Sequence, residues 1–287
     1  MPMPEGIKAI DAWINLNPPK GWIGHPIERY FRDAESLDRD ENPIGYLFPG
    51  ATERTMEGAT PEEIAALMDE VGIEKGLLYI PSGNPGPALK AIEQHPDKFV
   101  GALSLNPHKG MDEVRLLEKL VKEHGVKAAK VSAHTIQMPY NDKIYYPIYA
   151  KCIELDIPIT ANVGIPGPRV PGLGQHPIAL DEVCWFFPEL KVVMTHGGEP
   201  WQALCIKLML KWPNLYYMTS SFVPRHYPEE IIYYMNTRGT DKVMFATGYP
   251  NVGLERCMKE VRDLPLRDHV WVKFLRENAI KVFKLEE

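Results

Sequence analysis

"MDEVRLLEKLVKEHGVKAAKVS", residues 111–132, contains one helix–strand unit and decides the fold. Its first part has apolar residues at the three- and four-residue spacing of an amphipathic helix. Gly125 follows as the expected C-cap of that helix. Residues 126–132 are then a short apolar run typical of a buried strand. A helix that leads directly into such a strand is the repeating element of a parallel sheet.

The same alternation runs along the chain. Another helix is expected to begin at Thr60 as N-cap, with Pro61 in the first position and Glu63 completing a capping box. Eight strands are predicted between helices, at 7–11, 75–80, 99–105, 126–132, 157–164, 191–198, 215–221 and 242–248. Eight units in 287 residues favour a single-domain (β/α)8 TIM barrel over an open doubly wound sheet. No G-x-G-x-x-G motif follows the first strand, which weakens a nucleotide-binding alternative.

One long segment, 17–60, interrupts this pattern after strand 1. It is rich in Pro, Gly, Arg and Asp and has no clear periodicity. Loops of this length are usually functional or contact a partner, and this one would lie on the face where barrels carry out their chemistry. Its aromatic residues fit either a lid or a partner contact: Trp22, Tyr30, Phe31, Tyr46 and Phe48. We therefore treat 1–287 as one domain with 17–60 as an insertion.

Composition narrows the class of protein. The net charge is −6 and no basic block occurs, so we expect no nucleic-acid partner. No apolar run approaches the ~20 residues of a membrane span, and no signal peptide is evident, so a cytoplasmic protein without a membrane role is expected. The four cysteines are far apart and are predicted to be buried free thiols in a reducing compartment: Cys152, Cys184, Cys205 and Cys257.

Barrel enzymes place their active residues at the C-terminal ends of the strands. In this chain those ends hold polar, aromatic or small residues that could form a site. They are Asp11, Trp13 and Asn15; Ser82 and Asn84; Asn106 and His108; Lys130, Ser132 and His134; Asn162; His196 and Glu199; Ser220 and Ser221; Thr247, Gly248 and Tyr249. For Asp11 we expect a structural hydrogen-bonding role rather than a part in catalysis, because buried carboxyl groups are usually paired.

Four segments carry a resemblance to a known family. They are "YYPIYAKCIELDIPI" (145–159), "THGGEPW" (195–201), "FATGYPN" (245–251) and "LRENAIKVFKL" (275–285). In order and spacing they resemble the amidohydrolase-related family, which includes aminocarboxymuconate-semialdehyde decarboxylase and the resorcylate-type decarboxylases. The resemblance covers Ile7 to Leu285. It implies a TIM barrel with a metal centre at the C-terminal ends of the strands.

The metal centre that the resemblance implies uses H-x-H after strand 1, His after strand 5 and Asp after strand 8. Trp13, Asn15, Asn162 and Gly248 occupy these positions, and only the acid/base histidine after strand 6 is kept, as His196. Indole and glycine offer no ligand, and an amide oxygen is a weak one for zinc. We expect no metal or other cofactor in this chain, and Trp13 filling the vacated space.

Two interpretations follow. The first is an auxiliary subunit that pairs with a metal-bearing paralogue in a monooxygenase- or hydrolase-type complex, as the resemblance to the small subunit of two-subunit metal-dependent amine hydroxylases implies. The alternative is a metal-independent hydrolase or carboxy-lyase for a small carboxylate or lactone. In that enzyme His196 would be the acid/base, and Lys130, Asn162 and Asn15 would be polar contacts. A homo- or hetero-oligomer is expected in either case.

Two further groups stay open. His108, His134 and His196 could rebuild a different metal site, although their spacing specifies none. The glycine- and proline-rich loop 164–175 could cover a pocket or dock a partner, with Arg169 as an anion contact, or it could be a rigid surface loop.

Overall fold

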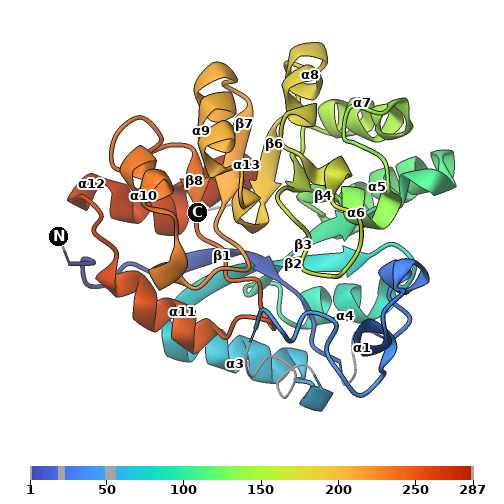
Figure 1. The fold of residues 1–287 in the computed structure, drawn as a ribbon. Coiled ribbons are helices and arrows are strands. Elements are labelled where there is room, and N and C mark those ends of the chain that lie inside the picture. Colours follow the sequence, from blue (N-terminus) through green and yellow to red (C-terminus); the bar gives the residue numbers. More distant parts are fainter. Residues whose placement is uncertain (1, 19–22, 49–55, 286–287) are drawn as a thin grey trace.

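The computed structural model describes residues 2–18, 23–48 and 56–285. In these residues eight parallel strands pair in sequence order, and helices surround them (Figure 1). The strands are β1 (Ala9–Ile14), β2 (Ile73–Pro81), β3 (Phe99–Ser104), β4 (Ala128–Val131), β5 (Ile159–Asn162), β6 (Val192–Thr195), β7 (Leu215–Met218) and β8 (Val243–Met244). The predicted (β/α)8 TIM barrel is confirmed.

The helices begin and end close to the sequence signals. Thr60 and Glu63 form the expected reciprocal capping box, and Gly125 ends its helix in the left-handed conformation at φ 64°. The α-helices are α1 (Ala34–Leu37), α3 (Pro61–Val71), α4 (Gly86–Gln94), α5 (Met111–His124), α6 (Ala133–Ile136), α7 (Tyr146–Glu154), α8 (Ala179–Phe186), α9 (Gln202–Lys211), α10 (Glu229–Met235), α11 (Leu254–Glu260), α12 (Asp268–Val272) and α13 (Asn278–Phe283). None of the described helices is long and apolar enough to cross a membrane.

The barrel closes between its first and last strands. The Ala12 amide donates to the Phe245 carbonyl at 3.1 Å. In addition, the buried Asp11 carboxylate accepts hydrogen bonds from the backbone amides of Trp13 at 3.0 Å and Thr247 at 2.9 Å. Asp11 therefore joins β1 to the chain after β8, which agrees with the structural role expected for it.

The observed strands differ from the predicted ones mainly at their ends. β1 begins and ends later than the predicted strand 7–11, so Trp13 lies inside the strand rather than after it. β8 contains only Val243–Met244, although 242–248 was predicted. Apolar runs indicate where a chain is buried, but the ladder hydrogen bonds that define a strand depend on the neighbouring strands. Sequence patterns therefore locate these strands but do not give their limits.

The core has two parts. A large cluster packs the surrounding helices onto the outside of the barrel, and a smaller one fills the interior with residues such as Ile10, Leu77 and Met218. Val282 and Phe283, at the C-terminal end of α13, belong to the interior cluster. This helix therefore packs against the barrel itself. All four cysteines are buried and free, as predicted.

Two contacts fix the position of the insertion 17–60. Asn17 and Ala59 form an antiparallel bridge that brings its two ends together. Its described part contains η1 (Pro26–Tyr30) and α1. Arg29 Nη2 donates to the Thr135 carbonyl at 3.0 Å, beside the residues that follow β4. These contacts place the described part of the insertion on the C-terminal face of the barrel. Trp22, one of the aromatic residues expected to matter there, lies outside the described residues.

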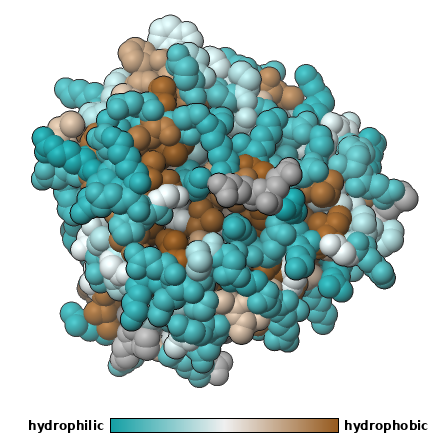
Figure 2. All heavy atoms as spheres, turned by 180° about the vertical axis from the view of Figure 1, so that it is seen from behind, coloured by the Kyte–Doolittle hydropathy of each residue, from teal (hydrophilic) through white to brown (hydrophobic). Residues whose placement is uncertain are grey.

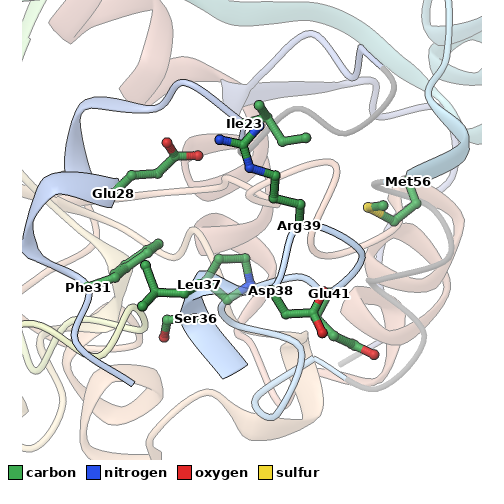
Figure 3. Close-up of a pocket in the computed structure, with 10 residues that line it drawn as sticks. Ile23, Glu28, Phe31, Ser36, Leu37, Asp38, Arg39, Glu41 and Met56 are labelled. Carbon is green, nitrogen blue, oxygen red and sulfur yellow. The ribbon is translucent and has the colours of Figure 1, made fainter. Parts of the chain in front are cut away.

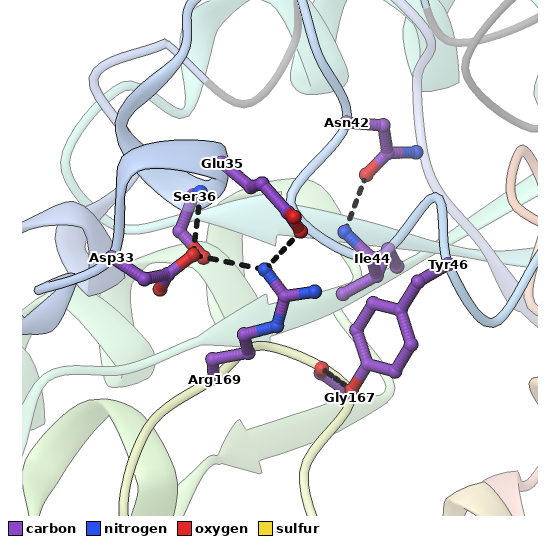
Figure 4. Close-up of polar contacts among 8 residues, drawn as sticks. All are labelled: Asp33, Glu35, Ser36, Asn42, Ile44, Tyr46, Gly167 and Arg169. Atoms are coloured by element: carbon purple, nitrogen blue, oxygen red, sulfur yellow. Dashed lines mark hydrogen bonds and ion pairs between the residues drawn. The ribbon is translucent and has the colours of Figure 1, made fainter.

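The loop 164–175 binds the insertion (Figure 4). Arg169 pairs with Asp33 at 2.9 Å and with Glu35 at 2.5 Å, and its guanidinium lies 4.9 Å from the ring centroid of Tyr46. The Tyr46 hydroxyl donates to the Gly167 carbonyl at 2.7 Å. The anions that Arg169 contacts are thus two carboxylates of this chain.

Candidate functional site at the C-terminal end of the barrel

Lys130, near the end of β4, lies against two aromatic rings. Its Nζ is 4.2 Å from the ring centroid of Trp13 and 5.1 Å from that of Tyr79, and these rings are 3.9 Å apart. Both aromatic residues are buried, whereas Lys130 keeps partial access to solvent. Among the described residues, none gives Nζ a hydrogen bond or an ion pair. Burial without a counter-charge lowers the pKa of Lys130 to about 7.

His196, directly after β6, contacts the same indole. Its ring centroid is 4.3 Å from that of Trp13, in an edge-on arrangement. Nδ1 lies 3.0 Å from Ser220 Oγ and 2.8 Å from Ser221 Oγ. Ser220 Oγ also accepts from the His196 amide, so its hydroxyl hydrogen is available to Nδ1. We therefore assign the proton of the neutral ring to Nε2, on the basis of this network.

The backbone and the surroundings of His196 both mark it as unusual. The residue has a left-handed φ of 63°, which is uncommon for a residue with a side chain. Burial lowers the pKa of His196 well below its ordinary value, and the nearby charges of Lys130 and His134 lower it further. The ring is therefore neutral at physiological pH, and it presents an N–H donor at Nε2.

His134, in α6, has the opposite tautomer. Gln175 donates through Nε2 to the Gly164 carbonyl at 2.9 Å, which leaves its Oε1 to accept from His134 Nδ1. The imidazole lone pair is then on Nε2. Burial lowers the pKa of His134 to about 4, with a smaller contribution from Lys130 in the same direction. The two histidines thus offer one donor and one acceptor.

His25, from the insertion, belongs to the same electrostatic group. Desolvation lowers its pKa, and so do Lys130 and His134, although the residue remains exposed to solvent. None of the groups that shift the pKa values of Lys130, His25, His134 and His196 is a carboxylate. A protonated Lys130 therefore makes this site positive, within a chain whose net charge is −6.

The residues at the four family metal positions do not fit a divalent ion. Trp13 brings an indole, and Asn15 donates through Nδ2 to the Tyr249 carbonyl at 3.2 Å. Asn162 Oδ1 accepts from Thr195 Oγ1 at 3.0 Å, so this oxygen is already engaged. Gly248 has a φ of 86°, and a Cβ there would lie 2.6 Å from the Ser221 backbone nitrogen. An aspartate at position 248, after β8, is therefore incompatible with this backbone conformation.

The structure does not assemble a replacement centre from the remaining histidines. His108 Nε2 lies 3.0 Å from the Ile136 carbonyl. No group of three or more His, Cys, Asp or Glu within the described residues could hold a metal ion, so His108, His134 and His196 do not form one there.

A separate pocket of about 150 Å³ lies within the insertion (Figure 3). Glu28, Asp38 and Glu41 line it together with Arg39, so it is mixed in charge and mainly acidic. Neither Lys130 nor the histidines of the barrel face are among its lining residues. The pocket is therefore distinct from the candidate site.

Of the three catalytic candidates from the sequence, Lys130 and His196 contact a common residue, Trp13, whereas Asn162 is buried and hydrogen-bonded to Thr195. Sequence reasoning missed Tyr79 and His25. Tyr79 looked like an ordinary strand residue, and His25 lies in a segment without periodicity. The hydroxyls of Ser220 and Ser221 were noted at a strand end, but nothing in the sequence linked them to His196.

Comparison with solved structures gives the same fold. An uncharacterised TIM-barrel protein from Bordetella bronchiseptica has a TM-score of 0.75 at 22% identity, over 96% of this chain and 98% of that chain. 5-Carboxyvanillate decarboxylase from Sphingomonas paucimobilis has a TM-score of 0.72 at 17% identity, over 98% and 100%. A 5-carboxyvanillate decarboxylase from Novosphingobium aromaticivorans, complexed with manganese, has a TM-score of 0.70 at 18% identity, over 98% and 97%. At these identities the likeness concerns the fold alone.

Sequence comparison adds the family. 2-Keto-4-carboxy-3-hexenedioate hydratase from Sphingobium sp. (strain NBRC 103272 / SYK-6) is 27% identical over 128 residues. That match spans only 38% of this chain and 38% of the hydratase. The family model described as amidohydrolase matches residues 10–285, nearly the whole length. The chain therefore belongs to the amidohydrolase family.

Proposed function

We propose that this chain is a metal-independent lyase that removes a carboxyl group from a small carboxylate at the C-terminal end of the barrel. One observation carries the proposal: Lys130 and His196 contact the same buried indole, and no carboxylate is among the groups that shift their pKa values. A cation without a counter-ion attracts an anionic ligand, which would supply the missing partner. Trp13 and Tyr79 would form the apolar wall beside it.

The donor and acceptor pattern fits this chemistry. Loss of CO2 leaves an electron pair on carbon, so the site needs a positive group to stabilise developing charge and a group to handle a proton. A protonated Lys130 meets the first need. His196 offers Nε2–H and His134 an Nε2 lone pair, through the hydrogen bonds that fix their tautomers. The Asn162 side-chain oxygen accepts a hydrogen bond from Thr195, the residue that precedes His196.

The relatives support the class of reaction. Two of the similar structures are named 5-carboxyvanillate decarboxylases, and the curated relative is named a hydratase of a keto tricarboxylic compound. We carry over only the broad class, which is cleavage or addition chemistry on a small carboxylate. The metal that accompanies one of those decarboxylases has no fitting donor set at the corresponding positions here.

The test is turnover of small oxo, unsaturated and hydroxyaromatic carboxylates by protein treated with a chelator, with CO2 release as readout and manganese content measured in parallel. We expect His196→Asn to lower kcat/KM by about 10²–10⁴-fold, the range of acid/base contributions. His226→Asn is the matched control, because His226 is exposed and outside the site. Activity that disappears on chelation and returns with manganese would contradict the proposal.

A second candidate is the auxiliary subunit of a complex with a metal-bearing paralogue. Exposed aromatic residues on α8 favour a partner: Trp185 and Phe186 are 68% and 56% exposed. Hydrophobic atoms also reach the surface in several separate areas of the face shown in Figure 2, which is otherwise mostly hydrophilic. Native mass spectrometry of the untagged protein from its own cell tests this role. A second, metal-bearing chain in the complex supports it, and a homo-oligomer that turns over substrate contradicts it.

A further inference from the structure

We propose that Lys130 acts as a covalent catalyst, forming an imine with the carbonyl carbon of a 3-oxo carboxylate before that substrate loses CO2. The inference rests on the lyase function proposed above and assigns it a substrate class. It also gives a role to the Lys130 ammonium group, which lies against two aromatic rings and has no polar partner among the described residues.

The position of Lys130 suits a nucleophile. It lies near the C-terminal end of β4, where the backbone is fixed by parallel pairing with β3 and β5. Strand pairing fixes the Lys130 backbone, the two rings contact the amine, and no ion pair among the described residues ties up its lone pair. Burial with no carboxylate among the groups that shift its pKa disfavours the ammonium form, which is how an amine is prepared for attack on a carbonyl. The lowered pKa of Lys130 agrees with this geometry.

The two histidine tautomers match the proton transfers. The Nζ lone pair attacks the carbonyl carbon, a C–N bond forms, and the C=O bond breaks as its oxygen takes up protons and leaves as water. With one proton taken up from solvent overall, the products are a protonated imine and one water molecule. His196 Nε2–H can donate a hydrogen bond to the departing oxygen, and His134 Nε2 can accept a proton from the attacking amine.

The imine then replaces a metal as the electron sink. In a 3-oxo carboxylate the bond between the carboxylate and C2 is adjacent to the imine carbon. When that bond breaks, CO2 leaves. The electron pair of the broken bond stays on C2 and moves toward the imine nitrogen, which gives a neutral enamine. Protonation at C2 and addition of water at the imine carbon release a ketone and the free Lys130 amine. Overall, one 3-oxo carboxylate and one proton give one ketone and one CO2.

The experiment is reductive trapping on the intact chain. Chelator-treated protein is incubated with 3-oxoglutarate and sodium cyanoborohydride, digested with trypsin and analysed by mass spectrometry. Reduction of the imine blocks cleavage at Lys130, so the adduct would lie on the peptide 128–143. We expect substrate-dependent labelling of that peptide in the wild type and in Lys259→Arg, whose lysine is exposed. Lys130→Arg keeps the charge but should lose the adduct and at least 100-fold of the decarboxylation rate.

The outcomes separate the two proposals. Decarboxylation with no adduct on 128–143, and with Lys130→Arg still active, overturns the imine and leaves the lyase function standing. Absence of both adduct and turnover with 3-oxoglutarate and the wider carboxylate panel overturns both. An adduct spread evenly over surface lysines, including Lys259, also overturns the inference. Trapping in the wild-type protein does not depend on whether the variant folds, and thermal unfolding of Lys130→Arg shows whether its rate can be compared.

Discussion

The two sides of the barrel mouth differ in what replaced the family chemistry. On the side of β1 and β8, Trp13, Asn15 and Gly248 occupy three of the four positions that the family resemblance assigns to metal ligands, and a Cβ at Gly248 would lie 2.6 Å from the Ser221 backbone nitrogen. The fourth, Asn162 after β5, is hydrogen-bonded to Thr195. On the side of β4 and β6, Lys130, His134 and His196 stay together without acidic partners among the groups that perturb them. The comparison indicates that the groups suited to chemistry gather on the β4–β6 side, whereas the β1–β8 side contributes the indole that they contact.

The largest expected effect tests whether the β1–β8 side can be reversed. Gly248→Asp restores the family residue, but it places a side chain at a φ of 86° and 2.6 Å from the Ser221 nitrogen. We expect a loss of about 2 kcal/mol or more in the free energy of unfolding, and no gain in manganese binding. Chemical denaturation and metal analysis measure the two. Gly83→Ala, where a Cβ meets nothing within 4 Å, is the control. Near wild-type stability with one bound manganese would break the comparison.

The next effect tests the uncompensated charge on the β4–β6 side. The folded pKa of Lys130 is lowered from 10.5 to about 7, so the unfolded chain binds more protons between these values and stability rises with pH across that window. Lys130→Met should therefore raise Tm at pH 7, by roughly 2–4 °C for about 1 kcal/mol after allowing for solvent screening.

That gain should shrink as pH rises toward 10.5 and disappear above it, where the wild-type amine is neutral in both the folded and the unfolded state. His25, His134 and His196 face the same charge, but their pKa values are lowered, so they do not titrate in this window. Lys259→Met should leave Tm unchanged. A Lys130→Met variant that is less stable at pH 7 would show that the cation–π contacts outweigh the burial of charge.

A smaller effect concerns Asp11, which supports the β1–β8 side from within. Burial raises its pKa to about 7 against three hydrogen bonds that favour the carboxylate. The folded state then binds the extra proton between pH 4 and 7, and stability falls as pH rises through that range. Asp11→Asn should flatten this slope while keeping an oxygen acceptor for Trp13 and Thr247. Denaturation at pH 4.5 and 7.5 measures the slope, and an unchanged slope would assign it to other groups.

The smallest global effect is expected at the insertion. Arg169→Gln removes two exposed ion pairs and the contact with Tyr46, and ion pairs that are screened by solvent contribute little to stability. We expect little change in Tm but faster proteolysis or hydrogen exchange within 23–48. Arg262→Gln, at an exposed position, is the control. Unchanged protection of 23–48 would show that other contacts hold the insertion over the β4–β6 side.

The sequence by itself determined the barrel and the place of the insertion. Helix signals such as Thr60 and Gly125 are local, since a capping residue acts on its own turn, and the alternation of apolar runs follows from burial on both faces of a parallel sheet. The replacements at Trp13, Asn15, Asn162 and Gly248 could be read from residue type, because ligand chemistry belongs to the side chain.

Only the tertiary structure decided which polar residues meet. Lys130 and Tyr79 are fifty-one positions apart, and Ser221 lies twenty-five residues after His196, so no local pattern relates them. The histidine tautomers depend on the Gln175 amide and on two serine hydroxyls that other elements bring in. Among the described residues, the lack of a carboxylate in the set of groups that shift the pKa of Lys130 is likewise a property of packing. Charge, tautomer and pKa are set by neighbours in space, and a barrel draws those neighbours from eight separate strand ends.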